Sequence, residues 1–134
     1  MTDFASWELQ QAVFAALNGD AALAARITGV FDQVPSGTAF PYVVIGDSKS
    51  EDWSSATFTG QEHRFTIEVW SQDTGRMEVK EIMGLIHDVL HDAPLALTGH
   101  QLVNLRLLTA EDALEADGIT YRGTLKFRAV TQAV

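Results

Sequence analysis

The chain has 134 residues, a net charge of −9 and no cysteine. This length fits one domain with a core of its own, and the lack of thiols excludes disulfides and thiolate metal sites. Nucleic-acid binding needs clustered Lys and Arg to neutralise phosphates, so the acidic charge argues against that class of protein. Apolar runs fall short of the ~20 residues that cross a bilayer, and Asp3 and Glu8 interrupt any signal-peptide pattern. We therefore expect no membrane partner.

The N-terminal segment is predicted to be helical. Residues 4–17 have the apolar spacing of an amphipathic helix, which Asn18 and Gly19 end. Asp20 can cap a second short helix over residues 21–27. The pattern predicts a helical hairpin or one broken helix. The apolar stripe of the first helix consists of Phe4, Trp7, Val13, Phe14 and Leu17.

Extended segments and a loop follow these helices. Residues 30–34 form a short extended piece, and residues 42–46 are typical of a buried strand. Residues 46–60 are rich in Gly, Ser, Thr and Asp, so we expect a long, mobile surface loop there. Trp53 and Phe58 are the only large apolar side chains in that loop.

The middle of the chain predicts a strand and then a helix. Residues 61–71 alternate between apolar and polar side chains, which indicates a half-buried antiparallel strand. Residues 76–92 carry the strongest helical pattern, with a core-facing stripe between Val79 and Leu90. Pro94 ends this helix.

The last third predicts a β-hairpin. Residues 100–114 and 119–132 both alternate, and the Asp117–Gly118 pair between them is a strong turn signal. In the first of these strands we expect Val103, Leu105 and Leu107 on one face. The other face would hold Leu102, Asn104, Arg106 and Leu108.

These patterns together predict an α+β fold. We expect a single antiparallel sheet of about four strands, with an N-terminal helix or helical hairpin and a long central helix packed on one face. Residues 1–134 contain no internal repeat, low-complexity tract or linker. A single domain over the whole chain is the simplest interpretation.

The sequence HDVLH places His87 and His91 four residues apart, close to the H-E-x-x-H signature of zinc hydrolases. On a helix both lie roughly 100–140° from the apolar stripe, so we expect them on the solvent side. A zinc site also needs a third ligand, and no spacing singles out His63 or His100 for that role. We interpret the pair as surface groups, favourable near a helix C-terminus and available to a neighbouring subunit. A His-based metalloenzyme is the less favoured alternative.

Other catalytic patterns are lacking as well. The glycines never form a phosphate-binding motif, and no G-x-S-x-G nucleophile turn is found. Gly84 lies inside the central helical pattern, where close packing against a neighbour would explain it. We therefore predict a protein that is not an enzyme, with no catalytic residues, no metal ligands and no cofactor.

Two features rise above this background as candidate interfaces. Trp53 and Phe58 either fold back over the core as a lid or anchor a partner, because Trp is enriched at interface hot spots. Alternation in the last strand points Arg122, Lys126 and Arg128 outward as a basic row. Such a row either protects a sheet edge from aggregation or contacts an acidic neighbouring subunit.

The whole chain resembles a known family through an ordered succession of segments. After the N-terminal helix come VPSGTAFPYVVIGD, then HRFTIEVWSQDTGRMEVKEIMGLIHDVL, LTGHQLVNLRLL and the closing DGITYRGTLKFRAVTQ. This order is similar to the phage tail-completion, or tail terminator, family of siphophage-like particles and gene transfer agents. The resemblance covers nearly all of the chain.

The resemblance implies a structural virion protein with no catalytic residues. A tail terminator assembles as a ring, typically a hexamer, that caps the tail tube, stops its polymerisation and joins it to the head connector. The expected partners are other copies of the chain, the tube protein and a connector or adaptor protein, and DNA would pass through the lumen without specific binding. The expected location is the tail or neck of a virion or virion-like particle assembled in the bacterial cytoplasm. A head–tail connector or adaptor ring of the neck is the alternative.

Overall fold

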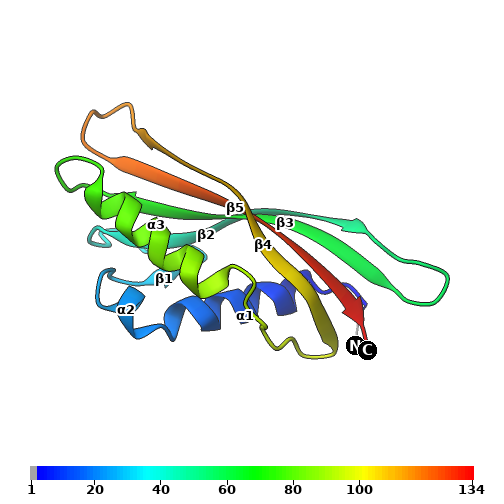
Figure 1. Ribbon diagram of the computed structural model, residues 1–134. Helices are drawn as coiled ribbons and strands as arrows, with labels where there is room; N and C mark the ends of the chain where they lie inside the picture. Colours follow the sequence, from blue (N-terminus) through cyan, green and yellow to red (C-terminus); the bar gives the residue numbers. More distant parts are fainter. Residues whose placement is uncertain (1–2) are drawn as a thin grey trace.

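A computed structural model describes residues 3–134, which form three helices and five strands (Figure 1). The first half contains helices α1 and α2 and strands β1, β2 and β3. The second half contains helix α3 and strands β4 and β5. In chain order the bounds are α1 Ser6–Asn18, α2 Ala21–Ala24, β1 Val30–Phe31, β2 Tyr42–Asp52, β3 Gly60–Ser71, α3 Met77–Leu90, β4 His100–Leu114 and β5 Tyr121–Ala133.

All five strands join one sheet in the order β1-β2-β3-β5-β4. The β1 strand runs parallel to β2, and the other neighbours are antiparallel. The predicted α+β class with a single sheet is confirmed. The strand number is five and the sheet is mixed, because β1 adds two residues, Val30 and Phe31, opposite Val43 and Val44. A two-residue strand is too short to show a periodicity.

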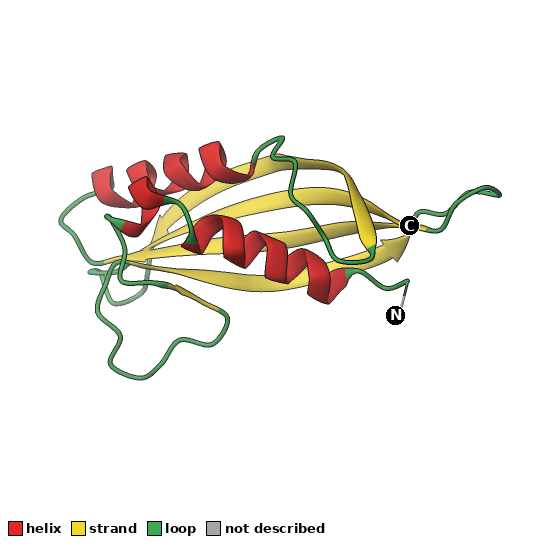
Figure 2. Ribbon diagram, turned by 90° about the horizontal axis from the view of Figure 1, so that it is seen from below, coloured by secondary structure: helices red, strands yellow, loops and turns green. Residues whose placement is uncertain are grey.

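The helices cover one face of the sheet (Figure 2), and the side view shows no helix on the other face (Figure 1). Helix α1 packs against β1 and β2, whereas α3 packs against β3, β4 and β5. Between these layers lies one apolar core, in which the rings of Phe65 and Phe127 stack 5.5 Å apart. Among residues 3–134, the helices are all too short or too polar to span a bilayer.

Helix α3 matches its prediction most closely. The stripe that it buries consists of Val79, Ile82, Met83, Ile86 and Leu90. At the first turn of α3, Asp112 of β4 forms ion pairs with Arg76 at 2.8 Å and with Lys80 at 2.9 Å. These two cations, Lys80 first, lower the pKa of Asp112. The expectation for Gly84 is wrong, because no neighbouring atom lies within 4 Å of the position where a Cβ would be.

Helix α1 faces the core with a different side from the one predicted. Its buried stripe is aliphatic and consists of Leu9, Val13 and Leu17. The aromatic side chains expected in that stripe are exposed: Trp7 by 59% and Phe14 by 38%. Phe4 precedes the helix and is exposed as well. Leu9, Val13 and Leu17 recur every four residues and share a face, so the seven-residue spacing of Trp7 and Phe14 belongs to a second, outward stripe.

The prediction of a long loop over residues 46–60 is wrong for the first half of that segment. Strand β2 shifts register between Ile45 and Ser48 and then continues to Asp52, paired with β3. Only residues 53–59 form a loop. Residues 49–64, which are the paired ends of β2 and β3 and the loop between them, are here called the arm and extend beyond the helices (Figure 1). Residues 49–52 on the β2 side of the arm have no buried side chain and therefore no apolar alternation, so their polar sequence resembles a loop although backbone pairing holds it.

Strand β4 also departs from the simple alternation. Its register shifts between Leu102 and Asn104 and again between Leu107 and Thr109. The first shift brings Leu102 against the core together with Leu107, so the prediction that Leu102 shares a face with Asn104 is wrong. A bulge adds one residue and reverses the alternation beyond it. Val103 and Leu108, which lie at the two shifts, are exposed by 46% and 44%.

Candidate interaction surfaces

The tip of the arm is built around two aromatic rings. The Trp53 N–H donates to the Gly60 carbonyl at 2.8 Å, and the Ser55 N–H donates to the Phe58 carbonyl at 3.0 Å. These bonds close the turn and bring the rings of Trp53 and Phe58 to 6.0 Å. Trp53 is exposed by 43%. The rings pack on each other at the end of the arm, so the alternative in which they form a lid over the core is wrong.

The basic row on β5 lies on the open face of the sheet, but most of it is already paired. Arg128 donates to Glu62 at 2.9 and 2.8 Å, and Arg122 pairs with Glu115 at 3.2 Å. Arg128 and then Arg64 lower the pKa of Glu62 by hydrogen bonding to it. Lys126 is exposed and forms no ion pair with any residue from 3 to 134. Of the three positive charges predicted in this row, only that of Lys126 has no carboxylate partner among residues 3–134.

The two histidines of HDVLH have different environments. Their rings stack 4.8 Å apart, and His87 lies at the surface beside Asp88, as predicted. His91 does not lie on the solvent side: its Nδ1 accepts a 3.0 Å hydrogen bond from the Leu107 N–H, where β4 is bulged. The sequence gives no signal for this bond, because it depends on which strand lies beside the helix end. Within the described part of the chain, no three His, Asp or Glu side chains are grouped as metal ligands.

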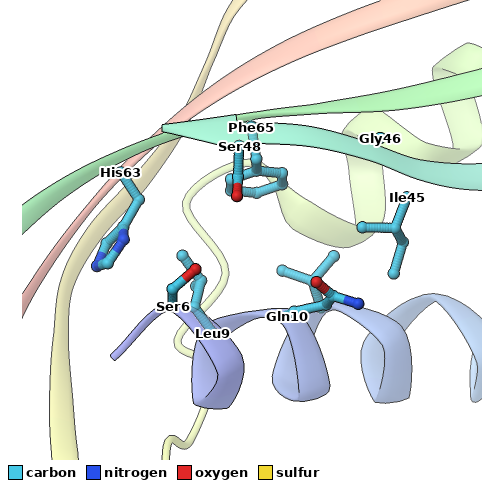
Figure 3. Close-up of a pocket in the computed structure, with 9 residues that line it drawn as sticks. Ser6, Leu9, Gln10, Ile45, Gly46, Ser48, His63 and Phe65 are labelled. Carbon is cyan, nitrogen blue, oxygen red and sulfur yellow. The ribbon is translucent and has the colours of Figure 1, made fainter. Parts of the chain in front are cut away.

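His63 lies in the interior, beside a small cavity under α1 (Figure 3). Its Nδ1 is 2.7 Å from the Ser50 Oγ, and its Nε2 is 2.9 Å from the Thr131 Oγ1. The cavity volume is about 20 Å³, enough for one water but not for a substrate. Burial, and then the nearby charge of His100, lower the pKa of His63. Its role is structural: it joins β2, β3 and β5 at the base of the arm.

This buried imidazole gives the fold a pH dependence. A lowered pKa in the folded state means that the unfolded chain binds protons more readily, so stability decreases as the pH falls below the unfolded value of about 6.5. We expect urea unfolding midpoints to fall between pH 7.5 and 5.5 in the wild type and to change much less in His63→Gln. The surface variant His87→Gln is the control and should keep the wild-type slope. An unchanged slope in His63→Gln would contradict the assignment.

A groove along the outer side of α1 was not predicted. It runs between α1 and the β1–β2 edge of the sheet and has a volume of about 450 Å³. The aromatic residues of the second α1 stripe, Trp7 and Phe14, form one wall. The full lining consists of Trp7, Gln10, Gln11, Phe14, Asp32 and Ile45. The seven-residue spacing of the two rings could have indicated this groove, but both rings were expected to face the core.

Comparison with known proteins identifies the family. The sequence matches the family described as Tail completion protein gp17 over residues 11–132. The chain belongs to this family. It is 29% identical over 124 residues to the tail completion protein gp17 of Bacillus phage SPP1, covering 92% of each chain.

Two solved structures agree with this assignment. A chain in the virion of a native gene transfer agent particle superposes with a TM-score of 0.90 at 34% identity, covering 96% of this chain and 98% of that one. The structure of gp17 from bacteriophage SPP1 superposes with a TM-score of 0.65 at 28% identity, covering 93% and 89%. The resemblance to the tail-completion family is thereby confirmed. The chain is a structural tail-completion component of a virion or virion-like particle.

Proposed function

We propose that this chain ends tail growth by forming a ring, with six copies as the simplest number, on the last layer of the tail tube. The ring stops polymerisation of the tube protein and presents its other side to the head connector. The family match over residues 11–132 carries this proposal. The whole chain, residues 1–134, acts as one domain, which a core that extends from Leu9 to Ala129 supports. It acts without catalytic activity.

The arm is the part of the chain proposed to contact the tube or the connector. It extends beyond the body of the molecule and ends in the Trp53–Phe58 pair. Packing between the two rings holds them in place before docking, so less side-chain entropy is lost on binding. Lys126 on the open sheet face is proposed to contact an acidic neighbour, with Arg122 and Arg128 held beside it by their own carboxylates.

The charge of the chain fits a ring through which DNA passes. With a net charge of −9, a lumen lined by acidic side chains releases no counterions when DNA enters and so does not bind it. The free cation Lys126 and the row around it then face away from the lumen. A structure of the assembled particle with this row lining the channel would exclude this part of the proposal.

Deletion of the gene tests the function. Without a terminator the tube protein keeps adding, so we expect overlong or headless tails by electron microscopy, restored to normal by the wild-type gene in trans. Normal-length tails joined to heads would exclude the proposal. Labelled protein found in the connector, away from the junction of tube and neck, would favour the alternative of a connector or adaptor ring.

The double variant Trp53→Ala/Phe58→Ala tests the arm in the same complementation assay. Both rings lie outside the core cluster, so the thermal unfolding temperature should change little, while complementation falls at least tenfold because the anchor is lost. Ile119→Ala is the matched control: its side chain is exposed on the opposite hairpin of the sheet. Full complementation by the double variant would remove the arm tip from the proposed interface.

A further inference from the structure

The two lateral edges of the sheet carry exposed apolar side chains of different kinds. At one edge β4 has no further strand beside it, and its bulged positions expose Val103 and Leu108. At the other edge the groove between α1 and β1–β2 exposes Trp7 and Phe14. Large apolar side chains that are exposed on one side of a protein mark interaction sites. Neither patch contains the arm tip or the basic row of β5.

The β4 edge is suited to a contact through side chains. Between its two bulges the backbone of this edge is already bonded, because the Asp92 N–H donates to the Leu105 carbonyl at 2.8 Å and the Leu107 N–H donates to His91. Bulges on an edge strand also oppose the addition of another strand. Arg106 lies between Val103 and Leu108 along this strand, with its side chain 60% exposed. Its one carboxylate partner, Asp92, is 3.5 Å away and also exposed, so its charge remains available to a second carboxylate.

The groove has the complementary chemistry. Trp7, Phe14 and Ile45 supply its apolar lining, the amides of Gln10 and Gln11 lie between them, and Asp32 is its only charged lining residue. Asp32 is exposed and forms no ion pair with residues 3–134. An apolar groove with one free carboxylate fits an apolar surface that carries one available guanidinium.

We propose that the groove of one copy receives the β4 edge of the next copy, with Val103 and Leu108 against Trp7 and Phe14 and with Arg106 beside Asp32. This contact rests on the proposed ring and supplies its subunit interface. It is heterologous, since one edge of the sheet meets the opposite edge of the neighbour, and repetition of such a contact closes into a ring. Two like edges are a poor match, because they would bring Arg106 against Arg106 or Asp32 against Asp32.

Disulfide trapping tests this contact cleanly, because the chain contains no cysteine. Cysteines are placed in pairs, Leu108→Cys or Val103→Cys with Phe14→Cys or Trp7→Cys, and assembled particles are oxidised and run on a non-reducing gel. Disulfides form where Cα atoms lie about 4.4–6.8 Å apart, so four pairs sample the contact. We expect at least one pair to give a ladder of covalent oligomers that ends at the subunit number of the ring.

The controls separate this contact from others. The two positions of each pair lie at opposite edges of one sheet, so a single chain cannot close the bond within itself. Phe14→Cys with Ile119→Cys, also exposed, should give no ladder. Dimers from Leu108→Cys alone would show a like-to-like contact and overturn the proposal. All four positions are exposed, and thermal unfolding of each variant verifies that it folds.

A charge exchange gives a second, independent readout. Arg106→Glu should reduce the ladder at least tenfold, and Asp32→Lys added to it should restore the ladder. Absence of a ladder from all four pairs, in particles with tails of normal length, overturns the interface and leaves the terminator function standing. The deletion experiment decides that function separately, so the failure of one can be told from the failure of the other.

Discussion

Phe127→Ala should lower the free energy of unfolding by about 3–5 kcal/mol. The Phe127 side chain is fully buried, and its ring lies 5.5 Å from that of Phe65 at an interplanar angle of 14°. Removal of the ring leaves a cavity beside Phe65 on the inner face of the sheet, where the surrounding core restricts collapse. A loss of this size is a large fraction of the roughly 5–15 kcal/mol that holds a domain folded.

Urea unfolding followed by circular dichroism measures this loss. The midpoint should fall while the slope with denaturant stays constant, since the same surface is exposed on unfolding. Phe14→Ala is the matched control: the same side chain is removed from an exposed position on α1, so we expect a change within about 1 kcal/mol. Equal losses in the two variants would contradict the assigned core.

Gly60→Ala should destabilise the base of the arm by about 1–3 kcal/mol. A Cβ at Gly60 would lie 2.9 Å from the Trp53 carbonyl oxygen and 3.0 Å from the Thr131 carbonyl oxygen. Both are backbone atoms, one at the start of the loop of the arm and one in β5, so relief of the clash requires the backbone to move. We expect a lower unfolding midpoint and faster hydrogen exchange at Trp53, whose N–H bonds to Gly60.

Gly84→Ala is the matched control and should have the opposite sign. It makes the same change in the middle of α3, where nothing lies within 4 Å of the added methyl group. Alanine favours a helix over glycine by about 1 kcal/mol, so this variant should be more stable than the wild type. A destabilised Gly84→Ala would show that α3 has a neighbour that the monomer does not contain.

Sequence patterns predicted the elements that are held by a buried face. The α3 stripe and the alternation of β5 are of this kind, and the stacked ring of Phe127 stands on the inner face as expected. Prediction failed where backbone pairing holds the chain without burial, as in β2 from Ser48 to Asp52. It failed again at Leu102, because a bulge reverses the faces of a strand and no residue type marks its position.

Among the candidate surfaces, too, some could be predicted from the sequence and others could not. Trp53 and Phe58 stood out because large apolar residues are rare in a polar segment. The groove beside Trp7 and Phe14 was missed, since an aromatic residue in an amphipathic helix is usually buried and the rotation of α1 is decided by Leu9, Val13 and Leu17. The bond from Leu107 to His91 depends on the placement of α3 beside β4, which is a tertiary property.

The last residues of β5 hydrogen-bond to the arm and help to hold it in place. The Ala133 N–H donates to the Thr59 carbonyl at 2.9 Å, and Ala133 also pairs with His100 of β4. An affinity tag or fluorescent protein fused after Val134 would therefore strain the hairpin that is proposed to dock. Insertion of the label at Asp117–Gly118, at the opposite end of the sheet (Figure 1), keeps it away from that hairpin. The site chosen for labelling thus decides whether a tagged copy can still complete a tail.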